Sequence, residues 1–440
     1  MQSLKRTQWA TTLCTATVLL AGGWPARAQT TPMTPLPFNA VSETAGATLL
    51  IPYFEVDLSN PNGSNTIFTV DKGGRLDLIN GTCCNNNLAT AVLAHVTVWS
   101  DLGVPVFNFN IYLTGYDVET VNMRSVLAGA LPRTASAGQD PQDTISPKGP
   151  KSQDINFASC TGQLPPAALT ATQVGNLTAA LTGQPAPTQC AGVNHNDNVA
   201  RGYVTVDVVT NCTPRNPGDP GYFNGDTTRQ NHLTGQVFYV DPSNAISRAG
   251  SVVHIHSDYT GNTDPLVTTS GNYTFYSRLD GFTAVDSRQP LSTTFVARYN
   301  PGGPVNSWRV PSSAKTSLIV WRDPKVPQGF FACNTTPSWY PLGQENITAF
   351  DEQEHVQTFM SGNPFPAATQ MVQVGGSALP VMFTSGYLFI NLNTVVVGAV
   401  GPMSDLSVAQ GWVQVIDGKF GALHHAQQLD SATFPAHFIP

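Results

Sequence analysis

Charged side chains are scarce in this 440-residue chain: Asp, Glu, Lys and Arg together make up 11% of it, against roughly 25% in ordinary soluble domains. The shortage of Glu, Lys and Arg removes the residues that usually cover exposed helix faces, which argues against a helical bundle or a coiled coil. The formal net charge is −7, and the charges are scattered. The sequence therefore predicts no binding to nucleic acid, which needs clustered Lys and Arg.

Standard catalytic motifs are missing as well. The chain contains no G-x-S-x-G nucleophile elbow, no G-x-x-x-x-G-K-[ST] phosphate loop, no H-E-x-x-H and no G-x-G-x-x-G after a strand. Catalytic triads can be assembled from scattered positions, so an enzyme is still possible. The missing motifs favour a non-catalytic protein, and we expect no cofactor.

The N-terminus is typical of a secretory signal peptide over residues 1–28. Lys5 and Arg6 precede a mostly apolar stretch, and Ala26-Arg27-Ala28 fits the A-x-A cleavage pattern. The apolar stretch is too short and too interrupted to span a bilayer, which takes about 20 residues. Cleavage would leave 18 basic and 28 acidic residues, a net charge of −10. We expect a secreted, periplasmic or cell-surface protein with no membrane span in the mature chain.

Six cysteines follow the predicted cleavage site, and an even number in an exported chain predicts up to three structural disulfides. The chain has no C-x-x-C pair and no Cys/His cluster with zinc spacing. Neighbouring Cys83 and Cys84 are expected to reach different partners. The pair expected first is Cys160 with Cys190, which flank a segment rich in Pro and Ala. The six are Cys83, Cys84, Cys160, Cys190, Cys212 and Cys333.

Short runs with β-branched and aromatic residues alternate with turn residues along the mature chain, a pattern typical of β-sandwiches. Residues 107–113 alternate apolar and polar side chains, which indicates a half-buried antiparallel strand. We predict an all-β protein of two tandem or packed antiparallel β-sandwich units, Ig-like or jelly-roll-like, over residues 29–245 and 246–440. A single large double-sheet domain is the alternative. Strands are expected at 49–58, 66–70, 94–99, 107–113, 202–209, 236–240, 251–256, 273–277, 293–299, 317–321, 386–392 and 411–416.

One region of the first unit departs from the strand pattern. Residues 130–165 are rich in Pro, Ser, Gly and Asp, which predicts a long loop. Residues 166–183 then carry apolar side chains at helical spacing after a proline, so we expect one short surface helix there.

Three short patterns occur twice in the same order, the first being N-P-x-G at residues 60–63 and 300–303. V-W-x-D-x-x-V-P is shared by residues 98–105 and 320–327, and G-[YW]-V-x-V by residues 202–206 and 411–415. A duplicated β-sandwich unit and convergent strand-end chemistry both explain the repeats. In either case we expect a strand to end in a buried aromatic residue, after which Asp and Pro turn the chain.

Three histidines are candidates for a metal site. His254 and His256 lie in a strand-like run, so both imidazoles would face one side of a sheet and could supply two ligands. His232 or Asp258 could supply a third. The alternative is a half-exposed pair on a polar face, with the apolar neighbours packed inward.

Acidic residues suggest two further candidate sites. Asp351 and Glu354 could serve as acid and base in glycoside hydrolysis, or they are solvated acids at the start of a turn. Asp219, Asn224 and Asp226 could offer oxygen ligands to calcium, although Asx turns account for the same residue types.

Three strings look familiar: L-I-P-Y-F-E-V-D-L at residues 50–58, H-V-T-V-W-S-D at 95–101 and F-D-E-Q-E at 350–354. In these strings the sequence resembles a group of uncharacterised secreted bacterial proteins, and the resemblance runs through most of the mature chain. It implies an exported bacterial β-rich protein. It implies no activity, ligand or catalytic residue.

We therefore expect an exported, non-catalytic binding or cell-surface protein, with an unknown surface or a carbohydrate as its ligand. Tyr222-Phe223 and Trp339-Tyr340 are candidates for an exposed aromatic sugar platform, although core packing explains most aromatic residues in strands. The alternative function is a secreted hydrolase that acts on a polymer such as a glycan.

Overall fold

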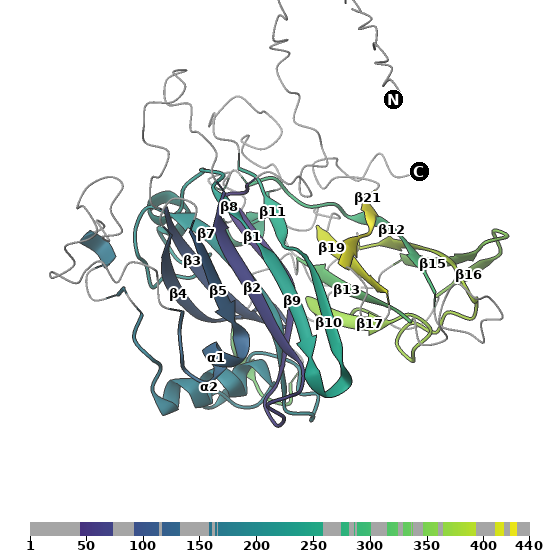
Figure 1. Cartoon of the computed structure of the whole chain (residues 1–440), viewed down its shortest axis with the longest axis horizontal. Helices are drawn as coiled ribbons and strands as arrows, with labels where there is room; N and C mark the ends of the chain where they lie inside the picture. The colour runs from purple at the N-terminus through teal and green to yellow at the C-terminus, as the bar shows by residue number, and fades with distance from the viewer. Residues whose placement is uncertain are drawn as a thin grey trace, which may run out of the picture. The chain divides into compact units, whose positions relative to one another are not determined.

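The computed structural model consists mainly of antiparallel β-strands, with three α-helices among the described residues, and the all-β prediction is confirmed. The strands form four sheets of four or five strands each and one two-stranded ribbon (Figure 1). All described residues lie in one compact unit, residues 37–440. The structure describes residues 45–73, 92–113, 117–132, 158–160, 163–164, 166–257, 274–280, 286, 288–300, 315–323, 329–335, 337, 346–359, 364–392, 410–417 and 423–428.

Two sheets are formed by strands from the first part of the chain. Sheet 1 has the order β11-β1-β7-β3-β4, and sheet 2 has the order β10-β9-β2-β5, with β8 beside β2. Their strands are β1 (Thr48–Asp57), β2 (Asn65–Lys72), β3 (Val92–Ser100), β4 (Pro105–Leu113), β5 (Val118–Asn122), β7 (Val199–Val209), β8 (Leu233–Thr234), β9 (Gln236–Asp241), β10 (Ile246–Ser251) and β11 (Val253–Ile255).

Two further sheets follow in the later part of the chain. Sheet 3 has the order β17-β13-β19-β20, and sheet 4 has the order β16-β15-β18-β12-β21. Their strands are β12 (Thr294–Tyr299), β13 (Thr316–Arg322), β15 (Asn346–Asp351), β16 (Val356–Thr358), β17 (Thr369–Gln373), β18 (Gly386–Asn391), β19 (Gly411–Asp417), β20 (Leu423–His425) and β21 (Gln427–Gln428). The ribbon pairs β6 (Gln189–Cys190) with β14 (Phe331–Ala332).

The sheets share hydrophobic cores because side chains alternate between the two faces of each strand. One core combines side chains of sheets 1 and 2, such as Val96 and Phe68. A second core combines side chains of sheets 3 and 4, such as Leu318 and Ile390. The opposite face of sheet 3 contributes Ile319 to the first core. Sheet 3 therefore buries side chains on both faces. So does sheet 1, because Leu50 of β1 lies in a different cluster from its neighbours Leu49 and Ile51.

Strand β4 of sheet 1 differs from its predicted pattern because residues on both of its faces are buried. Its apolar residues Phe109, Ile111 and Leu113 lie in the first core, as the alternation predicts. The opposite face was expected to be solvated, but Asn110 and Tyr112 are buried too. Asn110 is accommodated because its amide donates to the carbonyl oxygen of Thr213 at 3.0 Å, which satisfies a buried polar group.

Helix α2 (Ala171–Leu181) lies inside the segment predicted to be helical. Thr170 caps it: its hydroxyl accepts from the N–H of Gln173, whose side chain in turn accepts from the N–H of Thr170. This reciprocal cap fixes the start of the helix after the proline rather than at it. The sequence missed α1 (Met123–Leu127) and α3 (Ser277–Asp280), which are one turn or little more. No helix in the described part of the chain is long and apolar enough to cross a membrane.

The repeated patterns occupy equivalent places in sheets 1 and 3. Trp99 lies opposite Tyr203 in sheet 1, and Trp321 lies opposite Trp412 in sheet 3. The rings of Trp99 and Tyr203 stack at 5.5 Å, and that of Trp321 meets Tyr203 edge-on at 5.8 Å. The expected buried aromatic residue at the strand end is thus present in both copies. Together with their neighbours these rings form one cluster, the aromatic junction, made of Leu50, Trp99, Tyr203, Val253, Ile255, Phe275, Tyr276, Leu291, Trp321, Ala368 and Trp412.

One predicted strand and the predicted boundary between the two units can be compared with the structure. The predicted strand 273–277 is wrong over its described residues, which form a turn leading into α3, because Phe275 and Tyr276 bury their rings in the aromatic junction without joining a sheet. The predicted boundary between residues 245 and 246 falls between β9 and β10, which pair with each other. The division into units 29–245 and 246–440 stays a prediction.

Candidate binding pocket

The candidate catalytic acids Asp351 and Glu354 lie in the turn between β15 and β16. Asp351 accepts hydrogen bonds from the backbone N–H groups of Gln353 at 2.9 Å and His355 at 2.8 Å, and it contacts His355 Nδ1 at 2.7 Å. Desolvation acts to raise the pKa of Asp351, but these hydrogen bonds outweigh it and hold that pKa below its usual value. A general acid needs a raised pKa. The partly buried Asp351 and the exposed Glu354 therefore match the alternative of turn acids.

The candidate metal histidines differ in burial, and Asp258 lies outside the described residues. His254 is buried on β11 and His232 is buried ahead of β8, whereas His256 is partly exposed. His254 is not half-exposed, as the alternative supposed, because β11 pairs with β1 in a sheet that is covered on both faces. No group of three or more His, Cys, Asp or Glu that could hold a metal occurs among the described residues.

The candidate calcium oxygens are engaged within the protein. Asp226 accepts from Thr213 Oγ1 at 2.7 Å and from Arg215 Nη1 at 2.9 Å. Asp219 accepts from the N–H of Asn216 at 2.7 Å, which closes a turn. Asp226 thus belongs to a side-chain network with Thr213 and Arg215, and only Asp219 serves in a turn.

The aromatic candidates for a sugar platform have different outcomes. Tyr222 is buried, and its hydroxyl donates to Asp207 Oδ2 at 2.6 Å. The ring of Phe223 lies 5.2 Å from that of Tyr276, at the edge of the aromatic junction. Core packing accounts for both rings. Trp339 and Tyr340 lie outside the described residues.

Four cysteines form two disulfides, Cys160–Cys212 and Cys190–Cys333. The expected pair Cys160–Cys190 is wrong. Each of these cysteines bonds instead to one that lies farther away in the sequence, at separations of 52 and 143 residues, because the fold brings the Cα atoms of those pairs to 5.0 Å. Cys83 and Cys84 lie outside the described residues. The four described cysteines bond to one another, so none of them is the separate partner expected for Cys83 or Cys84.

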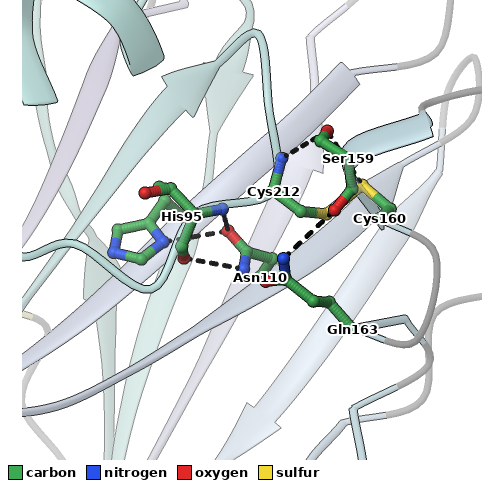
Figure 2. The surroundings of a disulfide bond; sticks show 7 residues. His95, Asn110, Ser159, Cys160, Gln163 and Cys212 are labelled. Carbon is green, nitrogen blue, oxygen red and sulfur yellow. Dashed lines mark hydrogen bonds between the residues drawn. A yellow bond between two sulfur atoms is a disulfide. The ribbon is translucent and has the colours of Figure 1, made fainter. Parts of the chain in front are cut away.

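The first disulfide fastens the segment before α2 to the end of sheet 1 (Figure 2). The N–H of Cys212 donates to Ser159 Oγ at 3.0 Å, and Gln163 Nε2 donates to the carbonyl oxygen of Ser159 at 3.1 Å. Nearby, His95 Nδ1 contacts Asn110 Oδ1 at 2.9 Å. Cys160 and Cys212 pack in a small apolar cluster, so their role is structural.

The second disulfide lies in the wall of a pocket with a volume of about 400 Å³. One wall is formed by residues of the segment 183–194 after α2, and the other by residues 331–337 around β14. Leu102, from the turn between β3 and β4, completes the lining. The pocket is thus built from three segments that are far apart in the chain.

Two glycines in the first wall allow close approaches, one to the backbone at Asn194 and one to the side chain of Asp101. Gly183 follows α2 with φ +71°, and a Cβ atom there would lie 2.3 Å from the backbone nitrogen of Asn194. A Cβ atom on Gly192 would lie 2.8 Å from Asp101 Oδ1. Any side chain at these positions would push the segment away from its supports.

The repeated V-W-x-D pattern holds this wall in place. Ser100 Oγ donates to the carbonyl oxygen of Ala191 at 2.7 Å, and Asp101 Oδ1 accepts from the N–H of Val193 at 3.0 Å. Asp101 Oδ2 lies 3.3 Å from His195 Nε2, which is half-exposed. The sequence marked Asp101 only as a turn residue. Its role as a support for the pocket depends on a segment about ninety residues away, which no local pattern reveals.

The second wall is attached to the first through the ribbon. Phe331 lies opposite Cys190, and Ala332 lies opposite Gln189. A ladder of two residue pairs is weak on its own, so the adjacent Cys190–Cys333 bond is a main fastening between the walls.

The lining combines polar and apolar side chains. Its polar side chains are three carboxamides and one hydroxyl, from Gln184, Asn194, Asn334 and Thr335. None of the described lining residues is ionisable, since both of the cysteines are oxidised. The described lining therefore offers hydrogen bonds and apolar contact.

No protein-family model, no curated protein and no solved structure matches this chain.

Proposed function

We propose that this chain is an exported, non-catalytic binding protein and that the pocket beside Cys190–Cys333 is its ligand site. The observation that carries the proposal is the pocket itself: it has about 400 Å³ of space, with a disulfide in its wall and hydrogen bonds from Ser100 and Asp101 behind that wall. Preformed pockets of about 300–1,000 Å³ are typical of small-ligand sites. The competing polymer hydrolase gains no support from Asp351 and Glu354, which lie in one exposed turn.

Export is part of the same proposal. Two disulfides occur among the described residues, and disulfides persist mainly in oxidising compartments. The signal-peptide pattern at residues 1–28 and the resemblance to secreted bacterial proteins agree with this. Mass spectrometry of the protein recovered outside the bacterial cytoplasm should show an N-terminus at Gln29; an intact Met1 on all of that protein would contradict export by cleavage.

The binding proposal is tested by screening small uncharged fragments with ligand-detected NMR. Gln184 is exposed and lines the pocket, so Gln184→Trp fills the space without disturbing a core. The control is Gln236→Trp, which places the same ring on an exposed strand end. Fragments should bind the natural protein and the control and fail to bind Gln184→Trp. Equal binding to all three, or no binding at all, would refute the proposal.

A further inference from the structure

The lining of the pocket indicates the class of its ligand. We infer that the pocket takes a neutral sugar, held as one ring or a short oligosaccharide end. This inference rests on the proposed function, because it names the ligand of that same site. It follows from the charge, the hydrogen-bonding groups and the apolar surface of the walls.

Charge excludes ionic ligands. None of the lining residues within the described part of the chain is ionisable, so a charged ligand would lose water without gaining a counter-charge from them, which is costly in a recess. The carboxylate of Asp101 lies against the first wall, where Val193 and His195 engage both of its oxygens. The carboxylate therefore supports the wall, and an uncharged ligand suits the pocket best.

Hydrogen-bonding capacity excludes a purely apolar ligand. Each carboxamide of Gln184, Asn194 and Asn334 has an acceptor oxygen and a donor NH₂ group. Asn194 Oδ1 already accepts from the N–H of Asn196 at 2.9 Å, so Asn194 would serve a ligand as a donor. An apolar ligand would leave these groups unpaired at the cost of their hydration. Hydroxyl groups, which both donate and accept, match this set.

The remaining lining is apolar and includes one aromatic ring. Phe331 comes from the second wall, and Leu102, Pro185 and Pro337 add aliphatic surface. An aromatic face packs well against an apolar ring face, and a pyranose has one beside its hydroxyl groups. A volume of about 400 Å³ is at the small end of the range for ligand pockets, which fits one or two sugar rings.

The test is saturation-transfer NMR with the methyl glycosides of glucose, galactose, mannose and N-acetylglucosamine. Each glycoside is used at about 10 mM, which is about ten times the millimolar Kd expected of a weak single-ring ligand. At least one glycoside should bind the natural protein, and glucuronate and glucosamine should bind more weakly. Phe331→Ala should weaken binding by about tenfold or more, because it removes the ring that packs on the sugar.

The chain offers a close control for this variant. Phe330 is 40% exposed and is not among the lining residues, so Phe330→Ala should bind the glycoside as the natural protein does. Gln184→Trp serves as a second blocking variant, should Phe331→Ala fold poorly in a thermal unfolding scan. A glycoside that binds equally well to Phe331→Ala and Gln184→Trp would show that the sugar site lies elsewhere and overturn the inference.

The inference and the proposed function fail in different ways. If uncharged fragments occupy the pocket and no glycoside binds, the sugar inference is wrong and the binding function stands. If neither fragments nor glycosides bind, both are wrong. If charged sugars bind as tightly as the neutral ones, the charge argument fails and the neutral class is refuted.

Discussion

At the scale of single residues, two aspartates of the repeated pattern have different tasks. Asp101 supports the pocket wall through Val193 and His195. Asp323, at the equivalent position, accepts from Gln410 Nε2 at 2.9 Å and forms an ion pair with Arg278, whose guanidinium lies 5.5 Å from the ring of Trp99. The repeated pattern thus places an aspartate at the same point of both sheets, but the neighbouring segments determine which residues each aspartate binds.

Replacing Asp101 should therefore loosen the pocket. Asp101→Ala leaves the N–H of Val193 without its acceptor and should lower the free energy of unfolding by about 1–3 kcal/mol and weaken ligand binding by about tenfold. Asp101→Asn keeps an acceptor oxygen and should restore most of the affinity. Asp323→Asn is the comparison: it should cost stability in urea unfolding and leave binding intact. Loss of binding in Asp323→Asn alone would contradict the assignment.

A glutamate in β5 makes stability depend on pH. Burial, and then the charge of Asp117, raise the pKa of Glu119 to about 7. Between its ordinary value of 4.5 and about 7, the folded protein holds a proton that the unfolded chain has released, so this contribution to stability is complete below pH 4.5 and is lost as the pH rises through 7. Glu119→Gln should raise the Tm at pH 8 and leave the Tm at pH 4 nearly unchanged.

The neighbouring acid provides a graded comparison for this effect. Asp117→Asn removes the second cause of the raised pKa, so it should lower the pKa of Glu119 and move the loss of stability to lower pH. Thermal unfolding scans from pH 4 to pH 8 measure both variants. A Tm of Glu119→Gln that follows the natural protein at every pH would refute the assignment.

At the scale of elements, several of the longer strands could be predicted, whereas the two-residue strands could not. The expected runs at 94–99, 107–113 and 411–416 coincide with β3, β4 and β19, because each carries enough apolar residues to define a face. Strands β6 and β14 have two residues each, too few for any period. Both strands contribute residues to the pocket lining. The sequence therefore could not predict the candidate site, because the strands that form it are too short to show an alternating pattern.

The two disulfides form a natural pair for comparison at this scale. They close segments of 52 and 143 residues, for which chain entropy gives similar stabilisation, about 4 and about 5 kcal/mol. Replacing either pair by serines should therefore lower the Tm comparably. Only the Cys190→Ser/Cys333→Ser protein should lose ligand binding, because only that bond joins the pocket walls. Equal loss of binding in Cys160→Ser/Cys212→Ser would indicate a global effect.

At the scale of the whole molecule, the aromatic junction connects sheets 1 and 3. Trp99 and Tyr203 come from sheet 1, and Trp321 and Trp412 come from sheet 3. The N–H of Thr369 also donates to the carbonyl oxygen of Asp101 at 3.1 Å. The sequence identified these aromatic residues as strand ends but not as mutual neighbours, because a repeat reveals likeness and says nothing about contact.

The junction should make the described sheets unfold together. Trp321→Ala should lower the free energy of unfolding by about 3–5 kcal/mol, as expected for a large buried ring, and Trp321→Phe should cost less. Hydrogen exchange should show faster opening in β7 of sheet 1 and in β18 of sheet 4 alike. Faster exchange confined to sheets 3 and 4 would show instead that the two parts unfold independently.

The bond between Cys190 and Cys333 also determines when, after synthesis, the pocket can bind a ligand. The second wall of the pocket is synthesised 143 residues after the first, and thiols stay reduced until the chain reaches an oxidising compartment. A ligand that needs both walls cannot be captured by a nascent chain or by its reduced precursor. If the chain is exported as we propose, binding should begin only after export, and ligand inside the producing cell should stay unbound.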